Sequence, residues 1–297
     1  MATGVPSRSG LADARRGILW MLLAMLAAVT MDTINKTLAQ SFPVPQLVWA
    51  RFVFHMVLML LLLGRRLPRM VVTRRPGLQA LRSFCLICAA SLFVNGLRLL
   101  PLADANAIIF FAPILVTALS APLLGESVDR RRWIGVALDF VGALIIIRPG
   151  SEVMRLAALL PLGAACFFAL YQIATKRLSG IDPPMTTLFY TGLVGALLTS
   201  ATVPFFWVTP EAADWFLLAM LGVLSGAAHF CIIKAFETAP AATVAPFIYS
   251  TLIWATLSGY IFFADLPDIW TVVAATVIVG SGLYITFQER LQRGAEP

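Results

Sequence analysis

The chain has 297 residues, of which 60% are hydrophobic and only 12% are charged, and its mean hydropathy is +0.87. A soluble protein of this size carries about 25% charged residues, so the composition predicts an all-α integral membrane protein. The net charge of +7 is assigned to loop arginines and not to a nucleic-acid-binding surface, because no helix-turn-helix or RNA-binding signature accompanies it.

A spanning helix needs about 20 mostly apolar residues, and about ten segments approach that length. No stretch remains that is long enough for a soluble domain. We expect spanning helices over residues 17–38, 46–63, 78–99, 103–124, 133–147, 156–178, 185–206, 215–235, 243–263 and 270–287.

Loop charges orient these segments. If the N-terminus is cytoplasmic, 17 of the 22 basic residues fall on the cytoplasmic side, three fall outside, and Lys36 and Arg51 lie within helices. This asymmetry predicts a multi-pass protein with both termini in the cytoplasm. The net charge of +7 and the expected lack of a cleavable signal suit a bacterial inner membrane. The first arginines resemble a signal peptide, but the apolar run continues into a charged cluster, so we expect a retained span.

The chain contains an internal repeat. The stretch 101–126 matches 240–265 at an offset of 139, and the first segment matches the sixth at nearly the same offset. Five helices per copy is an odd number, so the copies run in opposite senses, which is typical of secondary transporters. We expect a tail over 1–15, a first repeat over 16–148, a second over 149–288 and a tail over 289–297.

Several stretches resemble the EamA branch of the drug/metabolite transporter superfamily. They are MDTINKTLAQ in the first segment, FPVPQLVWARFVFH at the second, and LPLADANAIIFFAPILVTALSAPLLGE followed by GVALDFVGALIIIRPG. The resemblance covers residues 16–287 and implies two EamA-type units around a central cavity, working by alternating access. The second copy departs from the first, because Leu252 stands opposite Pro113 and Ala264–Asp265 stands opposite Gly125–Glu126.

A polar cluster ends the first segment. Asp32, Asn35 and Lys36 lie at i, i+3 and i+4, on one face of a helix. Charged groups in a span are costly unless they meet a cavity or a partner, so we expect them to contact the solute or to gate its path. The alternative is a surface cap with Lys36 extending to the interface. In the second copy Gln172 stands opposite Asp32, and Lys176 opposite Lys36.

Arg51 lies one turn into the second segment, with His55 a turn further on the same face. Arg51 either pairs with Asp32 or binds a carboxylate or phosphate of the solute, which its planar fork suits. His55 and His229 are candidates for a proton relay, since histidine titrates near neutral pH. The alternative for each is a hydrogen bond to a neighbouring backbone carbonyl.

Further polar residues lie inside the segments. Asn95 and Asn106 either line the cavity or hydrogen-bond between helices. Asp139, in the fifth segment, is a candidate protonation site for coupling, because a carboxylate within a span is functional by default. The alternative is a neutral, hydrogen-bonded side chain.

Aromatic residues at interior positions predict the cavity wall. Phe110, Tyr171, Tyr249 and Trp254 form this set, and Tyr249 stands opposite Phe110 in the repeat. An aromatic wall with a few polar tips suits a flat or amphipathic solute. The alternative is core packing or contact with lipid.

Small residues are expected to pack helices closely. Gly222 and Gly226 form a small-xxx-small pair, and 280–282 is a Gly-Ser-Gly run. Cys85 and Cys88 form a CxxC on one helix face without a second pair, so we assign them to packing and not to redox or zinc chemistry.

These observations predict a carrier of small organic metabolites, first as an exporter of amino acids or related compounds. The alternatives are an importer of a vitamin-like or nucleoside-like solute and a membrane scaffold or sensor. No enzyme motif or channel filter is present in the sequence, and it indicates no cofactor, metal or nucleic acid. The expected partners are a small organic solute and the lipid bilayer, and the sequence leaves open whether the protein is a monomer or a homodimer.

Overall fold

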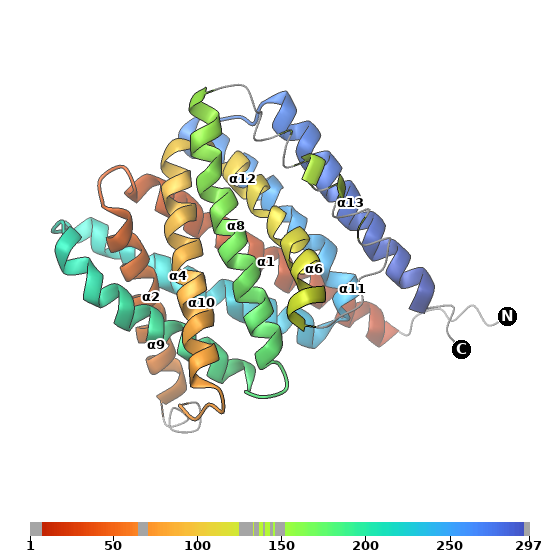
Figure 1. The fold of residues 1–297 in the computed structure, drawn as a ribbon, viewed down its shortest axis with the longest axis horizontal. Coiled ribbons are helices and arrows are strands. Elements are labelled where there is room, and N and C mark those ends of the chain that lie inside the picture. The colour runs from red at the N-terminus through yellow and green to blue at the C-terminus, as the bar shows by residue number, and fades with distance from the viewer. Residues whose placement is uncertain are drawn as a thin grey trace.

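A computed structural model of the protein describes residues 8–64, 71–124 and 152–293, together with residues 133, 137–138, 140–142 and 145. Helices and short turns make up these described parts (Figure 1). The elements are α1 (Arg8–Leu38), α2 (Val44–Leu63), α4 (Pro76–Leu99), α5 (Leu102–Ile109), α6 (Phe111–Leu124), α8 (Glu152–Leu178), α9 (Pro184–Thr202), η2 (Val203–Phe206), α10 (Ala212–Thr238), α11 (Ala241–Val244), η3 (Ala245–Tyr249), α12 (Ser250–Phe263) and α13 (Ile269–Arg293).

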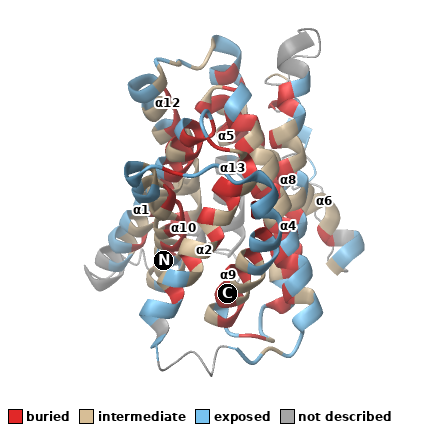
Figure 2. Cartoon of the chain, turned by 90° about the vertical axis from the view of Figure 1, so that its left-hand side faces the viewer, coloured by how far each residue is buried: buried red, intermediate tan, exposed pale blue. Residues whose placement is uncertain are grey.

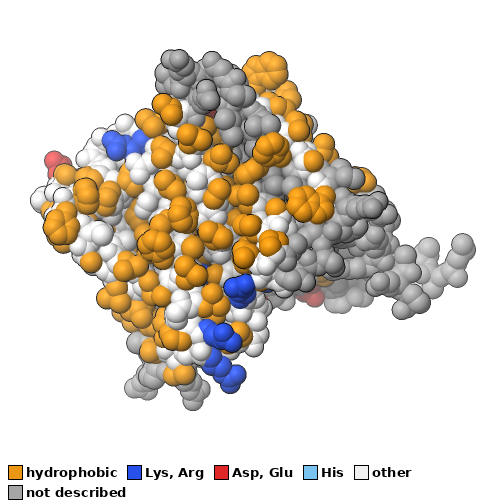
Figure 3. Space-filling model, in the orientation of Figure 1, with side chains coloured by type: hydrophobic (Ala, Val, Ile, Leu, Met, Phe, Trp, Pro, Cys, Tyr) orange, Lys and Arg blue, Asp and Glu red, His pale blue; other side chains and the backbone are white. Residues whose placement is uncertain are grey.

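Eight stretches within the described residues are long and apolar enough to cross a membrane. The apolar part of α13, Ile269–Ser281, is shorter, and the predicted fifth helix over 133–147 lies mostly outside the described residues. The face shown in Figure 3 is covered by hydrophobic side chains, with lysine and arginine towards its edges. An apolar band of this kind matches the hydrocarbon core of a bilayer.

Local sequence explains where several helices begin. Prolines stand in the first turns of α2, α4 and α9, where the missing backbone N–H has no helical partner in any case. At the start of α10, Glu211 and Asp214 form a capping box. The starts of these helices therefore follow the ordinary rules of helix capping, although the helices lie in an apolar environment.

Two of the predicted spans are broken, which corrects the expectation of continuous helices over 103–124 and 243–263. The first divides into α5 and α6 at Phe110, and the second into α11, η3 and α12. Pro113 cannot donate to the carbonyl of Ile109 and its ring crowds that carbonyl, so the helix breaks there. Pro246 stands at the start of the 3-10 segment in the second copy.

The two halves of the chain pack against each other through equivalent helices. The most extensive contacts join α4 to α8 and α1 to α10, so the first helix of each half packs on the third helix of the other half. The α2 and α9 helices, each second in its half, also meet. Figure 1 shows α4 and α8 side by side, and Figure 2 shows buried residues on the faces that the helices turn towards one another.

Glycines permit the approach of α10 to α2. A Cβ atom on Gly222 would lie 2.4 Å from the backbone nitrogen of His55, and one on Gly226 would lie 2.9 Å from Leu58. The predicted packing role of this pair is confirmed. The same prediction is wrong for Gly280, where a Cβ atom would have nothing within 4 Å. Gly280 lies beside a groove and not in a helix contact.

Candidate functional site

Lys36 joins the two halves at one end of the bundle. Its Nζ donates to the Leu100 carbonyl oxygen at 2.8 Å and lies 3.0 Å from Asp265 Oδ2. Leu100 ends α4 and Asp265 follows α12, so the ammonium group satisfies a helix-terminal carbonyl and an acidic side chain of the other half. The Phe263 ring lies 4.9 Å from Nζ. Lys36 therefore ties an end of the bundle, and the expectation that it contacts the solute or gates its path stays a prediction.

Asp32 lies one turn further into the bundle and is buried. Its carboxyl group interacts with the Asn106 side chain and with the charge of Arg51. Among the described residues no direct ion pair joins Asp32 to Arg51. The Nε of Arg51 donates to Ser225 Oγ of α10 at 3.3 Å. The structure thus brings Asp32, Arg51 and Asn106 to one region between the halves.

Arg82 is one of the 17 basic residues that the loop-charge count assigns to the cytoplasmic side, and the structure corrects this because the side chain is 3% exposed. Its guanidinium donates to Tyr171 Oη at 2.7 Å, to Thr175 Oγ1 at 2.6 Å, to the Thr187 carbonyl at 3.1 Å and to Thr191 Oγ1. It also lies 4.3 Å from the centre of the Tyr171 ring. Removing Arg82 from the loop charges leaves their asymmetry in the same direction.

A pocket of about 260 Å³ reaches Arg82 from the end opposite Lys36. It lies between α4 of the first half and α8, α9 and α10 of the second. His229 lines it, and its Nδ1 lies 2.8 Å from the Ser225 carbonyl. Because the Ser225 carbonyl oxygen can only accept a hydrogen bond, Nδ1 is the ring nitrogen that carries the proton in the neutral imidazole, and Nε2 is the ring nitrogen without one. The His55 ring lies 6.4 Å from that of His229, and both of its nitrogens are buried without a hydrogen-bond partner in the described part of the chain.

Asp182 stands at the mouth of this pocket, in the turn between α8 and α9. Gln79 Nε2 donates to its carboxylate at 2.9 Å, the Arg74 backbone N–H donates at 3.1 Å, and the Thr73 hydroxyl also donates. Burial alone would raise the pKa of Asp182, but these hydrogen bonds outweigh it and hold the pKa below its usual value. Asp182 therefore fastens the segment before α4 to the second half.

The two ends of this polar path are far apart. Arg82 and Leu100 belong to α4 and its cap, and 18 residues at 1.5 Å each separate them by about 27 Å. Lys36 ties the Leu100 end, whereas the pocket opens at the Arg82 end. Asp32 and Arg51 lie on α1 and α2 between the halves. The polar interior is therefore tied at one end and reached from the other.

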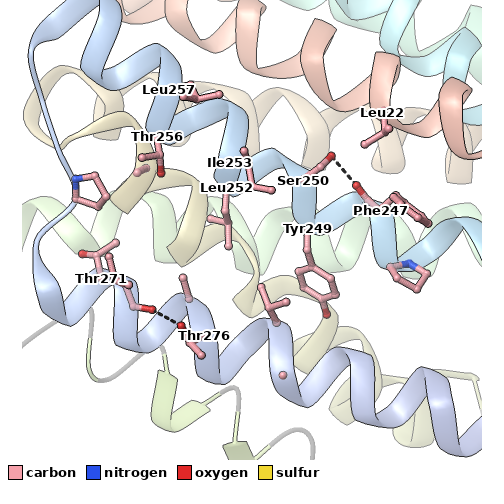
Figure 4. A pocket seen from close by; sticks show the side chains of 17 residues that line it. Leu22, Phe247, Tyr249, Ser250, Leu252, Ile253, Thr256, Leu257, Thr271 and Thr276 are labelled. Carbon is pink, nitrogen blue, oxygen red and sulfur yellow. Dashed lines mark hydrogen bonds between the residues drawn. The ribbon is translucent and has the colours of Figure 1, made fainter.

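The predicted aromatic pair meets at the two helix breaks. The rings of Phe110 and Tyr249 stack, with centroids 5.1 Å apart and an interplanar angle of 30°. The Tyr171 ring stacks on Phe168 at 5.5 Å. Figure 4 shows Tyr249 pointing into a groove of about 900 Å³ between α12 and α13. The Ser250 and Thr276 hydroxyls beside it donate to carbonyls of their own segments, so the groove offers an apolar surface.

The remaining predicted site residues are more dispersed. Asn95 donates to the Ser91 carbonyl at 2.8 Å within its own helix. Asn35 Nδ2 and Trp254 Nε1 are buried and find no hydrogen-bond partner within the described ranges, and Gln172 is half-buried beside Tyr171. Asp139 lies outside the described residues. Sequence reasoning missed Arg82, although an arginine next to the apolar run SFCLICAAS was a usable signal.

An all-helical membrane protein with two packed halves and a polar interior between them has the architecture of a solute transporter. The profile of the EamA-like transporter family matches residues 15–148 and 155–287, so the EamA unit occurs twice in this chain. The chain belongs to the EamA-like transporter family, as its motifs predicted. The family consists of transporters, which confirms that the protein is not an enzyme.

Several curated relatives align over nearly the whole chain. The S-adenosylmethionine uptake transporter of Rickettsia prowazekii is 26% identical over 92% of this chain and 93% of its own length. The riboflavin transporter of Vibrio cholerae is 30% identical over 91% and 93%. The pseudopaline exporter CntI of Pseudomonas aeruginosa is 27% identical over 87% and 93%. These similarities, with the spans, make the chain a multi-pass inner-membrane transporter of small metabolites.

A crystal structure shares the fold. It aligns over 97% of this chain and 99% of its own with a TM-score of 0.62, at 18% sequence identity. At that identity the likeness concerns the arrangement of the helices alone.

Proposed function

We propose that the protein is a secondary transporter that carries a small organic solute by alternating access between its two halves. The observation that carries this proposal is the asymmetry of the polar interior. Lys36 and Asp265 tie the halves at one end, while a pocket at the other end leads to Arg82 and His229. A channel would be open at both ends at once, whereas a carrier closes one end while the other is open.

The excess of basic loop residues supports a cytoplasmic location for the open end. The state described is then inward-open, with the Lys36 end closed towards the outside. Rocking of the halves around the Phe110–Tyr249 contact would break the Lys36–Asp265 pair and close the pocket. Asp32, Asn106 and Arg51 would meet the polar groups of the solute, and the stacked aromatic rings would meet its flat part.

The solute class is supported by chemistry common to the site and the relatives. Riboflavin and S-adenosylmethionine both contain flat nitrogen heterocycles, for which aromatic surfaces are suitable partners. We therefore place uptake of a nucleoside-like or vitamin-like solute ahead of the export of amino acids that the sequence favoured first. Export retains support from the similarity to the pseudopaline exporter.

Flux into proteoliposomes tests this function. Purified protein reconstituted with labelled riboflavin, S-adenosylmethionine or amino acids is expected to give saturable uptake that accelerates when unlabelled solute is placed inside. Asp32→Asn and Arg51→Gln are expected to abolish this flux while leaving the amount of reconstituted protein unchanged. Flux no higher than in empty liposomes for every solute would refute transport and favour a scaffold or sensor.

A further inference from the structure

The Arg82 guanidinium is a buried charge held by neutral groups. Its partners are three hydroxyls and one carbonyl, and among the described residues no carboxylate forms an ion pair with it. A buried charge with no counter-charge costs several kcal/mol. The pocket that reaches Arg82 supplies a route by which a counter-charge can enter.

The charged groups around the pocket leave it positive. The charges of Arg51 and Arg82 both act on His229, and Asp32 is the carboxylate that interacts with Arg51. Asp182 is the acidic residue that lines the pocket, but its oxygens already accept from three donors at the mouth. The Arg74 charge acts on Asp182 in turn, so Arg82 is the one charge of these five without a counter-charge, which favours a single negative charge on whatever enters.

Two free donors stand together at Arg82. A guanidinium has five N–H groups, and the four hydrogen bonds above leave one of them, on Nη2. The Tyr171 hydroxyl accepts from Nη2 at 2.7 Å, and its own proton has no acceptor among the described residues. A carboxylate has two oxygens spaced to accept from two neighbouring donors of this kind.

We propose that Arg82, which lines this pocket, and the Tyr171 hydroxyl, which is bonded to Arg82 Nη2 but is not itself among the lining residues, form an anion subsite that binds one carboxylate of the solute. The pocket volume of about 260 Å³ accommodates a carboxylate with a group the size of an amino-acid side chain. Thr175 and Thr191 hold the guanidinium in place, because each accepts from it while donating to a carbonyl of its own helix. The identification of this ligand as transported solute rests on the proposed function.

The test compares two probes of nearly equal shape and different charge. Purified protein in a neutral detergent is titrated with benzoate and with benzamide, and the apparent melting temperature is followed. Benzoate is expected to stabilise the protein at concentrations where benzamide does not. Equal stabilisation by the two probes would overturn the proposal. The absence of any stabilisation by benzoate up to about 50 mM would also overturn it.

Variants assign the binding to this subsite. Arg82→Gln is expected to weaken benzoate binding at least tenfold, and Tyr171→Phe, which retains the ring and its packing, about fivefold. Arg16→Gln is the matched control, because it removes an exposed arginine of α1 that does not line the pocket and should leave benzoate binding unchanged. If Arg82→Gln does not fold, Tyr171→Phe decides, and unchanged benzoate binding in that variant refutes the subsite.

Two further results separate this proposal from its alternatives. Inorganic phosphate that stabilises as strongly as benzoate would refute the preference for a carboxylate and indicate a general anion site. Carboxylate binding that depends on Arg82 without any solute flux would leave the subsite standing and refute the transport function. Saturable transport of a solute that is unaffected by Arg82→Gln and Tyr171→Phe would support the transport function and refute the subsite.

Discussion

Replacing Lys36 with methionine is expected to release the tied end of the bundle. Lys36 makes two hydrogen bonds from its charged Nζ, to the Leu100 carbonyl and to Asp265. The Lys36 side chain is 10% exposed and that of Asp265 is 38% exposed. Solvent screening limits the ion pair to about 1 kcal/mol, whereas the buried bond to Leu100 contributes about 1.5 kcal/mol.

These values set the expected shift between the closed and open states of this end. Asp265→Asn removes the ion pair and should shift the equilibrium roughly fivefold towards the open state, at 1.4 kcal/mol per tenfold. Lys36→Met removes both bonds and should shift it roughly 50-fold. The double variant should be no more open than Lys36→Met alone, because Asp265 then has no partner left to lose.

Distances between spin labels on Gln40 and Leu266 report this opening, since both positions are exposed beside the pair. Lys36→Met is expected to add a population at longer distances, and Asp265→Asn a smaller one. Lys234→Met is the matched control, because its pair with Glu237 lies within one helix and cannot change with the opening of the bundle. Unchanged distances in Lys36→Met would refute the reasoning.

Three further predictions follow from packing and charge. Gly222→Ala should lower the apparent melting temperature, through about 1–3 kcal/mol of overpacking against α2, whereas Gly280→Ala should leave it unchanged; similar effects of the two would contradict the packing assignment. The ionised Asp182 side chain stabilises the fold above the usual carboxyl pKa near 3.9, and this stabilisation is lost as the pH falls through its lowered pKa in the folded protein. The apparent melting temperature of the wild type should therefore fall more steeply than that of Asp182→Asn between pH 5 and 3. Parallel plots of melting temperature against pH for the two proteins would refute this. Phe110→Ala and Tyr249→Ala should show a coupling energy of about 0.5–1.5 kcal/mol in a double-mutant cycle followed by thermal unfolding. If the two rings do not stabilise each other, the effects of the two substitutions will simply add.

The spans were predictable from sequence because hydropathy over 20 residues depends little on neighbouring helices. The break at Phe110 was harder, because Pro122 and Pro161 lie inside helices that continue past them. Whether a proline ends a helix in a membrane depends on which neighbouring groups satisfy the freed carbonyl. The repeat offset nevertheless places Phe110 opposite Tyr249, and the two rings stack in the structure.

Partners across the two halves were the main part of the site that sequence could not supply. Asp265 lies 229 residues from Lys36, and Thr175 lies 93 residues from Arg82. A single sequence contains no information that selects such pairs among many polar residues. Arg82 was misplaced because its position near a segment end resembled that of a loop charge, whereas burial depends on α8 and α9, which cover it.

The packing of each first helix on the third helix of the other half has a consequence for biogenesis. α1 cannot make its most extensive helix contact until α10 is made, and about 170 residues separate the end of α1 from the start of α10. At 5–20 residues per second, synthesis of that interval takes roughly 10–35 s. During this time Asp32 can already meet Arg51 and Asn106 of the first half, whereas Lys36 lacks Asp265, its partner from the second half. The nascent chain therefore depends on the insertion machinery or on temporary contacts within the first half to shield Lys36 from lipid.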